Sequence, residues 1–451
     1  MNSKQQNDLV VNSFLERTFL GGWKNPELER YQNMNRVEIF FDSKCNLNCK
    51  YCYLARFKDL YPMEIQGNEN LLKNMDLILK WFVKNKYHPD IEFFSGEPLI
   101  QDTAFKAIDM ILDTYKYLPF KPNSITVPTN YTFLLKDDLT KRVENLLAKG
   151  KECGIGIYLS ASFDGKYCED NRPLRAFKRE VDPRDDAYYD KCFEFSAKYN
   201  FGFHPMVYSE HIEDWPKNFL WFQENMKKHG IPPNAIYLLE VRNEEWTNKQ
   251  INDLGDFMKF LIKWTFEELC HKDIGKLVQV ILEGKGYNIL GNPFSTIGRG
   301  LGCSIQSILD IRVGDLSLVP CHRTSYAPFV LGHLNVENNE ITGIEADNPE
   351  LLLTIYSLNA NNFPFCESCM IKHLCCKGCL GSQFETTGDL FTPIPTVCKM
   401  EHKKILSIIE ALDETKALGT LMNYIAPEKV RAIDLLWKIK SEKKCDQQLK
   451  S

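Results

Sequence analysis

The residues best suited to chemistry are cysteines, and three of them, Cys45, Cys49 and Cys52, stand within eight residues. Clustered thiols in a chain that begins without a secretory signal indicate metal binding rather than disulfide bonds. Structural zinc takes four ligands, often from two CxxC pairs, whereas this segment offers three thiolates and no clear fourth. Three thiolates on a four-iron cluster leave one iron free to bind another ligand. The spacing therefore favours an iron–sulfur cluster with an open position.

A second group of cysteines lies in the last third of the chain. Four follow the spacing Cx2Cx5Cx3C and three stand around them: Cys366, Cys369, Cys375 and Cys379, with Cys303, Cys321 and Cys398. We predict that these also bind iron–sulfur clusters, with a zinc ribbon as the alternative because CxxC pairs suit zinc. The scattered cysteines are expected to be core thiols: Cys153, Cys168, Cys192, Cys270 and Cys445.

Apolar, β-branched or aromatic segments alternate with helical patterns through the first half of the chain. Buried strands are predicted at 37–41, 91–94, 124–127, 155–163, 201–209 and 235–241. Strands that alternate with helices indicate parallel βαβ units, and about six such units are expected. Parallel sheets bind ligands at the C-terminal ends of their strands. The first cysteine loop follows the first predicted strand and so lies at such an end.

Three further motifs follow the next three strands. They are Ser95-Gly96-Glu97-Pro98, Thr129-Asn130 and Ser162-Phe163-Asp164-Gly165. Each alone is more often a turn, but their order and spacing, together with the CxxxCxxC loop, resemble the radical S-adenosylmethionine (SAM) family. The resemblance implies an α/β fold with a partial (β/α)6 barrel. Two departures are Ser95, where relatives carry glycine, and Tyr131, where relatives carry the glycine of TNG.

The resemblance also implies how the cofactor is bound. The open iron of the cluster would chelate the amino and carboxylate groups of SAM, and one electron would release a 5′-deoxyadenosyl radical. Tyr51 occupies the aromatic position before the last cysteine of the loop. The SGEP backbone would meet the methionyl amino group, because glycine permits close approach, and the SFDG motif would serve the ribose. Arg172 and Arg175 are candidates for the cofactor carboxylate, or a solvated surface pair.

The C-terminal cysteines resemble the SPASM extension of peptide-modifying radical enzymes. Carried over by position, an outer auxiliary cluster takes Cys366, Cys369, Cys375 and Cys398, and an inner one takes Cys303, Cys321 and Cys379. With the SAM cluster this makes three [4Fe-4S] clusters. The inner cluster lacks an obvious fourth cysteine. Its last iron is expected to be open, or to be closed by Cys376 or another group.

The reaction is less clearly indicated than the cofactor. Ribosomal-peptide maturases, which install crosslinks or invert stereocentres, are the larger group with this extension, so a peptide or protein substrate is expected. In sulfatase maturases an acid follows the second auxiliary cysteine, whereas here His322 follows Cys321. His322 is a candidate base, since histidine titrates near neutrality, or a side chain that packs on the cluster. A small-molecule dehydrogenase and a non-catalytic electron carrier are the alternatives.

The bulk properties set further limits. The chain has 451 residues, 44% of them hydrophobic, and a net charge of −5, so nucleic acid is not an expected partner. No long apolar run predicts a membrane span, and a cytoplasmic location is expected. Because 44 residues precede Cys45, a complete leader-binding domain is not expected, and a separate leader-binding protein would be a partner beside a flavodoxin or ferredoxin. The predicted domains are an extension (1–35), the barrel (36–245), a helical linker (246–299), the SPASM domain (300–400) and a helical tail (401–451).

Overall fold

The computed structural model describes residues 36–41, 44–57, 60, 68–94, 96–173, 186–243, 245–284, 288–294, 305, 308–358 and 363–448. The predicted N-terminal extension lies outside these residues. Three of the predicted site residues also lie outside them: Ser95, Arg175 and Cys303.

Four parallel strands form the centre of the fold, in the order β1-β2-β3-β4 within one sheet. They are β1 (Arg36–Phe40), β2 (Asp90–Phe94), β3 (Ser124–Thr129) and β4 (Gly156–Ala161). Every neighbouring pair runs parallel. These strands agree with the first four predicted from the sequence, and their C-terminal ends meet at one edge.

The fifth and sixth predicted strands are much shorter than expected. They are reduced to β5 (Met206–Val207) and β6 (Leu239–Glu240), which pair with each other in parallel. Single parallel bridges from Ala161 to Phe203 and from Phe203 to Ile236 continue the sheet order. Pro205 stands between the bridge and β5 and has no backbone N–H, so a regular ladder cannot run through it.

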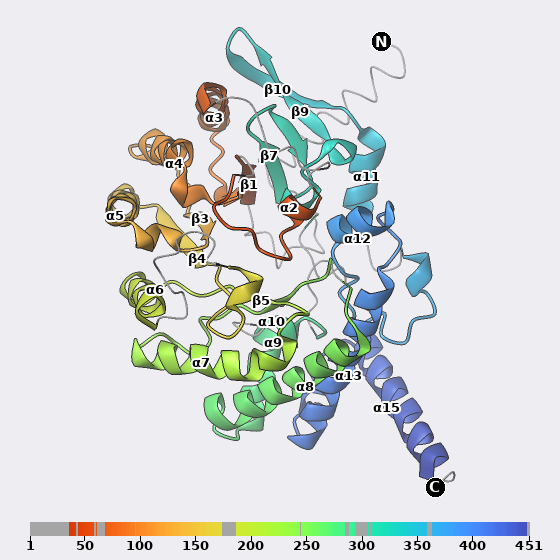
Figure 1. The fold of residues 1–451 in the computed structure, drawn as a ribbon. Coiled ribbons are helices and arrows are strands. Elements are labelled where there is room, and N and C mark those ends of the chain that lie inside the picture. Colours follow the sequence, from red (N-terminus) through yellow and green to blue (C-terminus); the bar gives the residue numbers. More distant parts are fainter. Residues whose placement is uncertain are drawn as a thin grey trace.

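Helices follow the strands and cover the outer face of the sheet, as the ring of ribbons in Figure 1 shows. They are α3 (Asn68–Lys84), α4 (Asp102–Tyr115), α5 (Asp137–Cys153), α6 (Asp186–Tyr199) and α7 (Trp215–Lys228). In α3 the apolar residues recur at helical spacing, so that Met75, Ile78 and Phe82 are fully buried. A short helix, α2 (Tyr53–Arg56), follows the first cysteine loop.

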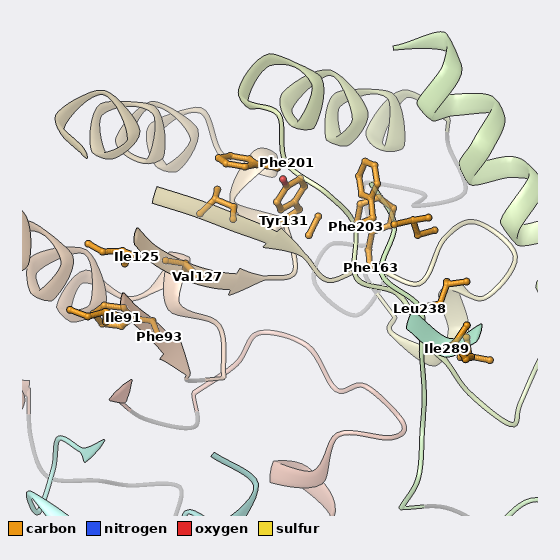
Figure 2. Close-up of a cluster of buried hydrophobic side chains, with 14 of the residues drawn as sticks. Ile91, Phe93, Ile125, Val127, Tyr131, Phe163, Phe201, Phe203, Leu238 and Ile289 are labelled. Carbon is orange, nitrogen blue, oxygen red and sulfur yellow. The ribbon is translucent and has the colours of Figure 1, made fainter. Parts of the chain in front are cut away.

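The main core lies between the strands and this ring of helices. Alternate strand residues point to the helices, among them Ile91, Phe93, Ile125 and Val127 (Figure 2). Four of the cysteines predicted to be core thiols are indeed buried: Cys153, Cys168, Cys192 and Cys270. The fifth, Cys445, lies in a part of the last helix whose side chains the structure does not describe.

The C-terminal strands extend the same sheet beyond β1. They are β7 (Ile308–Arg312), β8 (Ser317–Val319), β9 (Gly332–Glu337) and β10 (Glu340–Ala346). β7 pairs with β1 in parallel, and the remaining strands follow as antiparallel hairpins. The cysteine-rich region and the parallel strands thus share one eight-stranded sheet.

The remaining helices close the molecule on the other side. They are α8 (Asn248–Trp264), α9 (Ile274–Glu283), α10 (Asn288–Gly291), α11 (Pro349–Ser357), α12 (Leu380–Thr387), α13 (Pro395–Glu414), α14 (Leu418–Met422) and α15 (Pro427–Gln448). A capping box of Thr247 and Gln250 starts α8. This helix crosses α13 (Figure 1), and Gly255 permits the close approach because a Cβ there would collide with Lys403 and Ser407.

A buried ion network fastens α13 to the barrel. Lys404 of α13 contacts Glu240 of β6 at 2.5 Å and Glu401 at 2.7 Å. Arg242 contacts the same two carboxylates at 2.5 and 3.4 Å. The side chains of Lys404 and Glu240 are 0% exposed. Two positive and two negative groups therefore balance one another out of contact with water.

This balance predicts a large loss of stability in Lys404→Met. Removing one partner of a buried pair leaves a carboxylate uncompensated, which costs about 3–5 kcal/mol. Lys263→Met is the matched control, because Lys263 of α8 pairs with Glu414 of α13 at a half-exposed site. The loss of such a pair costs about 0–1 kcal/mol. Urea unfolding of both variants measures the difference. Equal midpoints would contradict this role of the network.

Candidate functional site

The first cysteine loop lies at the C-terminal end of β1, as predicted. Cys45 is exposed, and Cys49 and Cys52 are half-buried. The backbone N–H of Cys52 donates to the carbonyl of Cys49 at 3.1 Å, so these two stand on one turn. Lys50 N–H donates to the carbonyl of Asn171 at 3.0 Å and joins the loop to the segment after β4. Burial raises the pKa of Cys49 to about 12, against the lowering effect of Arg172.

The second motif is tied to the first and third by one carboxylate. Glu97 is 2% exposed, and its N–H donates to the carbonyl of Lys44 at 2.8 Å. Its carboxylate accepts from the hydroxyl of Thr129 at 2.7 Å and from the N–H groups of Asn130 and Leu99 at 2.6 and 3.1 Å. Burial raises the pKa of Glu97 to about 7 despite these donors.

The rest of the second motif shapes the backbone beside Glu97. Pro98 begins a short 3₁₀ turn, Pro98–Ile100, and is buried. Its fixed φ suits the first position of such a turn. Gly96 is half-buried between Glu97 and the end of β2.

The third motif braces the cysteine loop. Asn130 donates through Nδ2 to Asn46 Oδ1 at 2.9 Å, and its Oδ1 accepts from the hydroxyl of Thr132 at 2.6 Å. Asn46 in turn donates to that hydroxyl at 2.8 Å. Tyr131 has φ +63°, the left-handed region in which relatives would use glycine. A non-glycine residue there costs about 1–3 kcal/mol, and Tyr131 offsets this cost with a fully buried ring.

The fourth motif forms a buried network with the aromatic residue of the cysteine loop. Tyr51 donates to Asp164 Oδ2 at 2.6 Å, and Met206 N–H donates to Asp164 Oδ1 at 3.0 Å. Arg172 donates through Nε to the Tyr51 hydroxyl at 3.0 Å and through Nη1 to the carbonyl of Ser162. Tyr51, Asp164 and Arg172 therefore join the first cysteine loop to the end of β4.

Arg172 supplies the positive charge of the site. Its guanidinium lies close enough to lower the pKa of Cys49, Glu97 and Asp164 against the raising effect of burial. The same charge acts on His204, whose pKa burial lowers to about 4. A guanidinium, which is always charged, is suited to bind a carboxylate.

His322 lies on the inner side of the sheet, close to the cysteine loop. Its N–H and its Nδ1 both contact Glu38 Oε2, at 2.9 and 3.1 Å. Its ring stacks on Phe94 with centroids 3.7 Å apart and planes 9° apart. Burial raises the pKa of Glu38, but the contacts with His322 offset this and hold it below its ordinary value. Burial and the neighbouring Glu38 raise the pKa of Asp310 on β7.

Four of the described C-terminal cysteines line one cavity: Cys366, Cys375, Cys379 and Cys398. Burial raises the pKa of Cys398 to about 11, and neighbouring Cys366 and Cys369 raise it further. Three of the four lining cysteines, Cys366, Cys375 and Cys398, belong to the predicted outer set, and the fourth, Cys379, belongs to the predicted inner set.

Cys321 and Cys379, the described members of the predicted inner set, both lie near Tyr326. Burial raises the pKa of Tyr326, and both thiols contribute to that rise. Cys376 is not among the cavity residues. It is 3% exposed, and its pKa, which burial raises, responds to Arg242, Glu401 and Lys404 of the buried ion network.

The arrangement of the cysteine thiols differs between a site for a single metal ion and a site for an iron–sulfur cluster. Among the described residues no three Cys, His, Asp or Glu side chains are placed to hold a single metal ion. A [4Fe-4S] cluster binds each thiolate to a different iron, so it needs thiolates around a shared space rather than around one point. The cavity with its four cysteines fits that need, and so does the loop from Cys45 to Cys52.

Sequence reasoning missed several residues of the site. Asn46 carries no motif signal, and its role depends on the loop fold. His204 has a buried Nε2 without a hydrogen-bond partner among the described residues, and only its place in a predicted strand pointed to it. Glu38 looks like any strand residue until the pairing of β1 and β7 brings it to His322.

The comparisons with known proteins agree with this architecture. No family model matches the chain. Over 131 residues it is 30% identical to the radical SAM cyclopropyl synthase TigE of Paramaledivibacter caminithermalis, a match that covers 24% of this chain and 27% of that protein. The chain thus spans about a quarter of that relative. It is 26% identical over 259 residues to the uncharacterized protein MJ0907 of Methanocaldococcus jannaschii, covering 55% of this chain and 82% of that one.

A solved structure matches nearly the whole chain. Native anSMEcpe with bound AdoMet and the Cp18Cys peptide is 17% identical, with a TM-score of 0.56, and the match covers 86% of this chain and 99% of that one. The chain has the radical SAM fold. No helix in the described ranges is long and apolar enough to cross a membrane.

The buried carboxylate of Glu97 predicts a pH dependence of stability. The pKa of Glu97 is about 7 in the folded protein and exceeds the ordinary glutamate value of 4.5, so the folded state binds the proton before the unfolded state does as the pH falls. Stability from this group should therefore rise between pH 7 and pH 4.5, by roughly 3 kcal/mol. In Glu97→Gln this rise should disappear when unfolding is measured at pH 8 and pH 5.

Glu144→Gln is the control for this titration. Glu144 is partly exposed, and the hydrogen bond from Lys198 lowers its pKa from the ordinary glutamate value. Between pH 8 and pH 5 the free energy of unfolding of Glu144→Gln should change with pH as it does in the wild type. If the free energy of unfolding of Glu97→Gln also follows the wild type over this pH range, the prediction of a raised pKa for Glu97 is wrong.

Proposed function

We propose that the protein is a radical SAM enzyme that cleaves SAM reductively and abstracts hydrogen from a peptide or protein substrate. One observation carries the proposal. The Cys45–Cys52 loop, the Glu97 loop and the end of β4 all lie close to the cation Arg172. An electron carrier has no use for a carboxylate-binding cation and a glycine loop beside its cluster.

Each element of the site then has a task toward the cofactor. Cys45, Cys49 and Cys52 hold the [4Fe-4S] cluster, which supplies the electron that cleaves the sulfonium of SAM. Gly96 and its neighbours Ser95 and Pro98 offer backbone groups to the methionyl amino end. Thr129 and Asn130 are proposed cofactor contacts that also hold Glu97 in place.

The remaining cofactor contacts are proposed around the fourth motif. Arg172 is placed to meet the carboxylate of the cofactor, a task for which Arg175 remains a second candidate. Ser162 and Asp164 serve the ribose end, and Tyr51 orients Asp164 through its hydroxyl. Because Asp164 is buried and held by two donors, the network keeps one geometry.

We further propose that residues 300–400 form a SPASM domain with two auxiliary clusters, after a barrel at 36–245 and a helical linker at 246–299, and before a helical tail at 401–451. The outer auxiliary cluster takes Cys366, Cys369, Cys375 and Cys398; the inner auxiliary cluster takes Cys303, Cys321 and Cys379. The cavity supports the outer assignment for Cys366, Cys375 and Cys398, which line it together with Cys379 of the inner set. Together with the first cluster the protein would hold three.

The substrate is proposed to reach the inner side of the sheet between the two cluster regions. His322 faces that side, fixed by Glu38 and stacked on Phe94. With Nδ1 toward Glu38, its Nε2 is available to take a proton from a substrate. The peptide bound to anSMEcpe supports a peptide substrate. A crosslink or an epimerisation is the proposed modification, and a flavodoxin or ferredoxin and a leader-binding protein are the proposed partners.

The first experiment is an iron count after anaerobic reconstitution. Three [4Fe-4S] clusters predict roughly twelve irons per chain. Changing Cys45, Cys49 and Cys52 to alanine together should remove roughly four of them and abolish formation of 5′-deoxyadenosine from SAM. Cys153→Ala, a core thiol, is the control and should keep both. Stoichiometric zinc with little iron would show that the proposed function is wrong.

A second experiment asks whether Cys376 closes the inner cluster. Its thiol lies with the buried ion network rather than in the cysteine-lined cavity. Cys376→Ala should therefore leave the paramagnetic resonance signals of both auxiliary clusters unchanged, whereas Cys379→Ala should alter one. A lost or strongly altered signal in Cys376→Ala would make Cys376 a ligand and exclude an open iron there.

A further inference from the structure

Helix α13 carries a cysteine and a histidine, two residue types that often bind metals, on the same face. Cys398 stands in its first turn, and His402 follows four residues later. Residues four apart in a helix lie on the same side. The opposite side of α13 is buried through Met400, Ser407 and Ala411. Because that packing fixes the rotation of the helix, Cys398 and His402 both face the loop that carries the CxxC pair.

His402 contacts a sulfur of the proposed outer auxiliary cluster. Its Nε2 lies 3.4 Å from Cys369 Sγ, and its side chain is half-buried. A second sulfur of the same set accepts a backbone hydrogen bond, from Lys377 N–H to Cys375 Sγ at 3.3 Å. Donors thus already surround this set of thiols. His402 is the one imidazole that reaches a cysteine sulfur among the hydrogen bonds of the described residues.

We propose that His402 is a positioning residue that donates a hydrogen bond to the Cys369 sulfur and raises the reduction potential of the outer auxiliary cluster. The proposal rests on the proposed function, which places that cluster here. Hydrogen bonds to the sulfurs of an iron–sulfur cluster are one of the factors that set its potential. A donor stabilises the reduced state more, because reduction increases the negative charge on the sulfurs. His402 keeps its proton on Nε2 for this task.

The competing possibility is that His402 is itself a ligand. Cys366, Cys369, Cys398 and His402 have the residue types of a Cys₃His zinc site. However, the described residues include no three such side chains placed around a single ion. A sulfur that lies at hydrogen-bond distance from a ring nitrogen, in a site without ion geometry, favours donation over coordination.

The test compares His402→Leu, which removes the donor, with His402→Gln, which keeps an N–H donor. His373→Leu is the control, because His373 is exposed in the same cysteine-rich segment and forms no hydrogen bond to a cysteine sulfur among the described residues. All three are made in a background with Cys45, Cys49 and Cys52 changed to alanine, so that only auxiliary clusters give signals. Iron, sulfide and zinc are counted, and a redox titration is followed by paramagnetic resonance.

His402→Leu should keep the full iron content while the reduced fraction of one auxiliary cluster falls. At a fixed potential the ratio of reduced to oxidised cluster should drop about tenfold, which is about 59 mV for one electron. His402→Gln should lie nearer the parent, and His373→Leu should match it. An unchanged potential in His402→Leu overturns the proposal, and so does a loss of iron or zinc, which makes His402 a ligand. If the parent itself holds no auxiliary cluster, the proposed function fails before any His402 variant is measured.

Discussion

The pairing of β1 on both of its edges is the constraint on which the rest of the structure depends. β1 is hydrogen-bonded to β2 on one side and to β7 on the other. Its alternate residues divide between two environments, since Val37 and Ile39 pack against the helices while Glu38 lies on the inner side. One short strand thus carries the first cysteine loop and receives the turn at His322. This strand therefore fixes where the cysteine loop and His322 lie relative to each other.

Side chains that each connect two loops make the site rigid. Glu97 joins the ends of β2 and β3, and Asp164 joins the cysteine loop to β5. Both carboxylates are 2% exposed, so each would be costly to leave without donors. The same burial raises their pKa values against the donors that hold them. The site therefore gives up some stability for a fixed geometry, as functional sites commonly do.

The sequence predicted what depends on local patterns and missed what depends on distant pairing. The first four strands and the loops at their ends follow from apolar runs and motif order. The fifth and sixth strands are shorter than predicted, because Pro205 interrupts the ladder. The sequence spacing could not decide whether Arg172 or Arg175 meets the cofactor carboxylate. In the structure Arg172 belongs to the network of Tyr51 and Asp164. Arg175 lies outside the described residues. The contact of Glu38 with His322 depends on two strands that are far apart in the chain, which no local pattern reveals.

The pairing of β1 with β7 also has a consequence during synthesis. Arg36 pairs with Ile308, so one edge of β1 has no partner until most of the chain has left the ribosome. At about 5–20 residues per second, this interval lasts for roughly 15–55 seconds. The loop from Cys45 to Cys52 is made at the start of that interval and the C-terminal cysteines at its end. The nascent chain therefore carries its first three clustered thiols well before the cysteine-rich region is made.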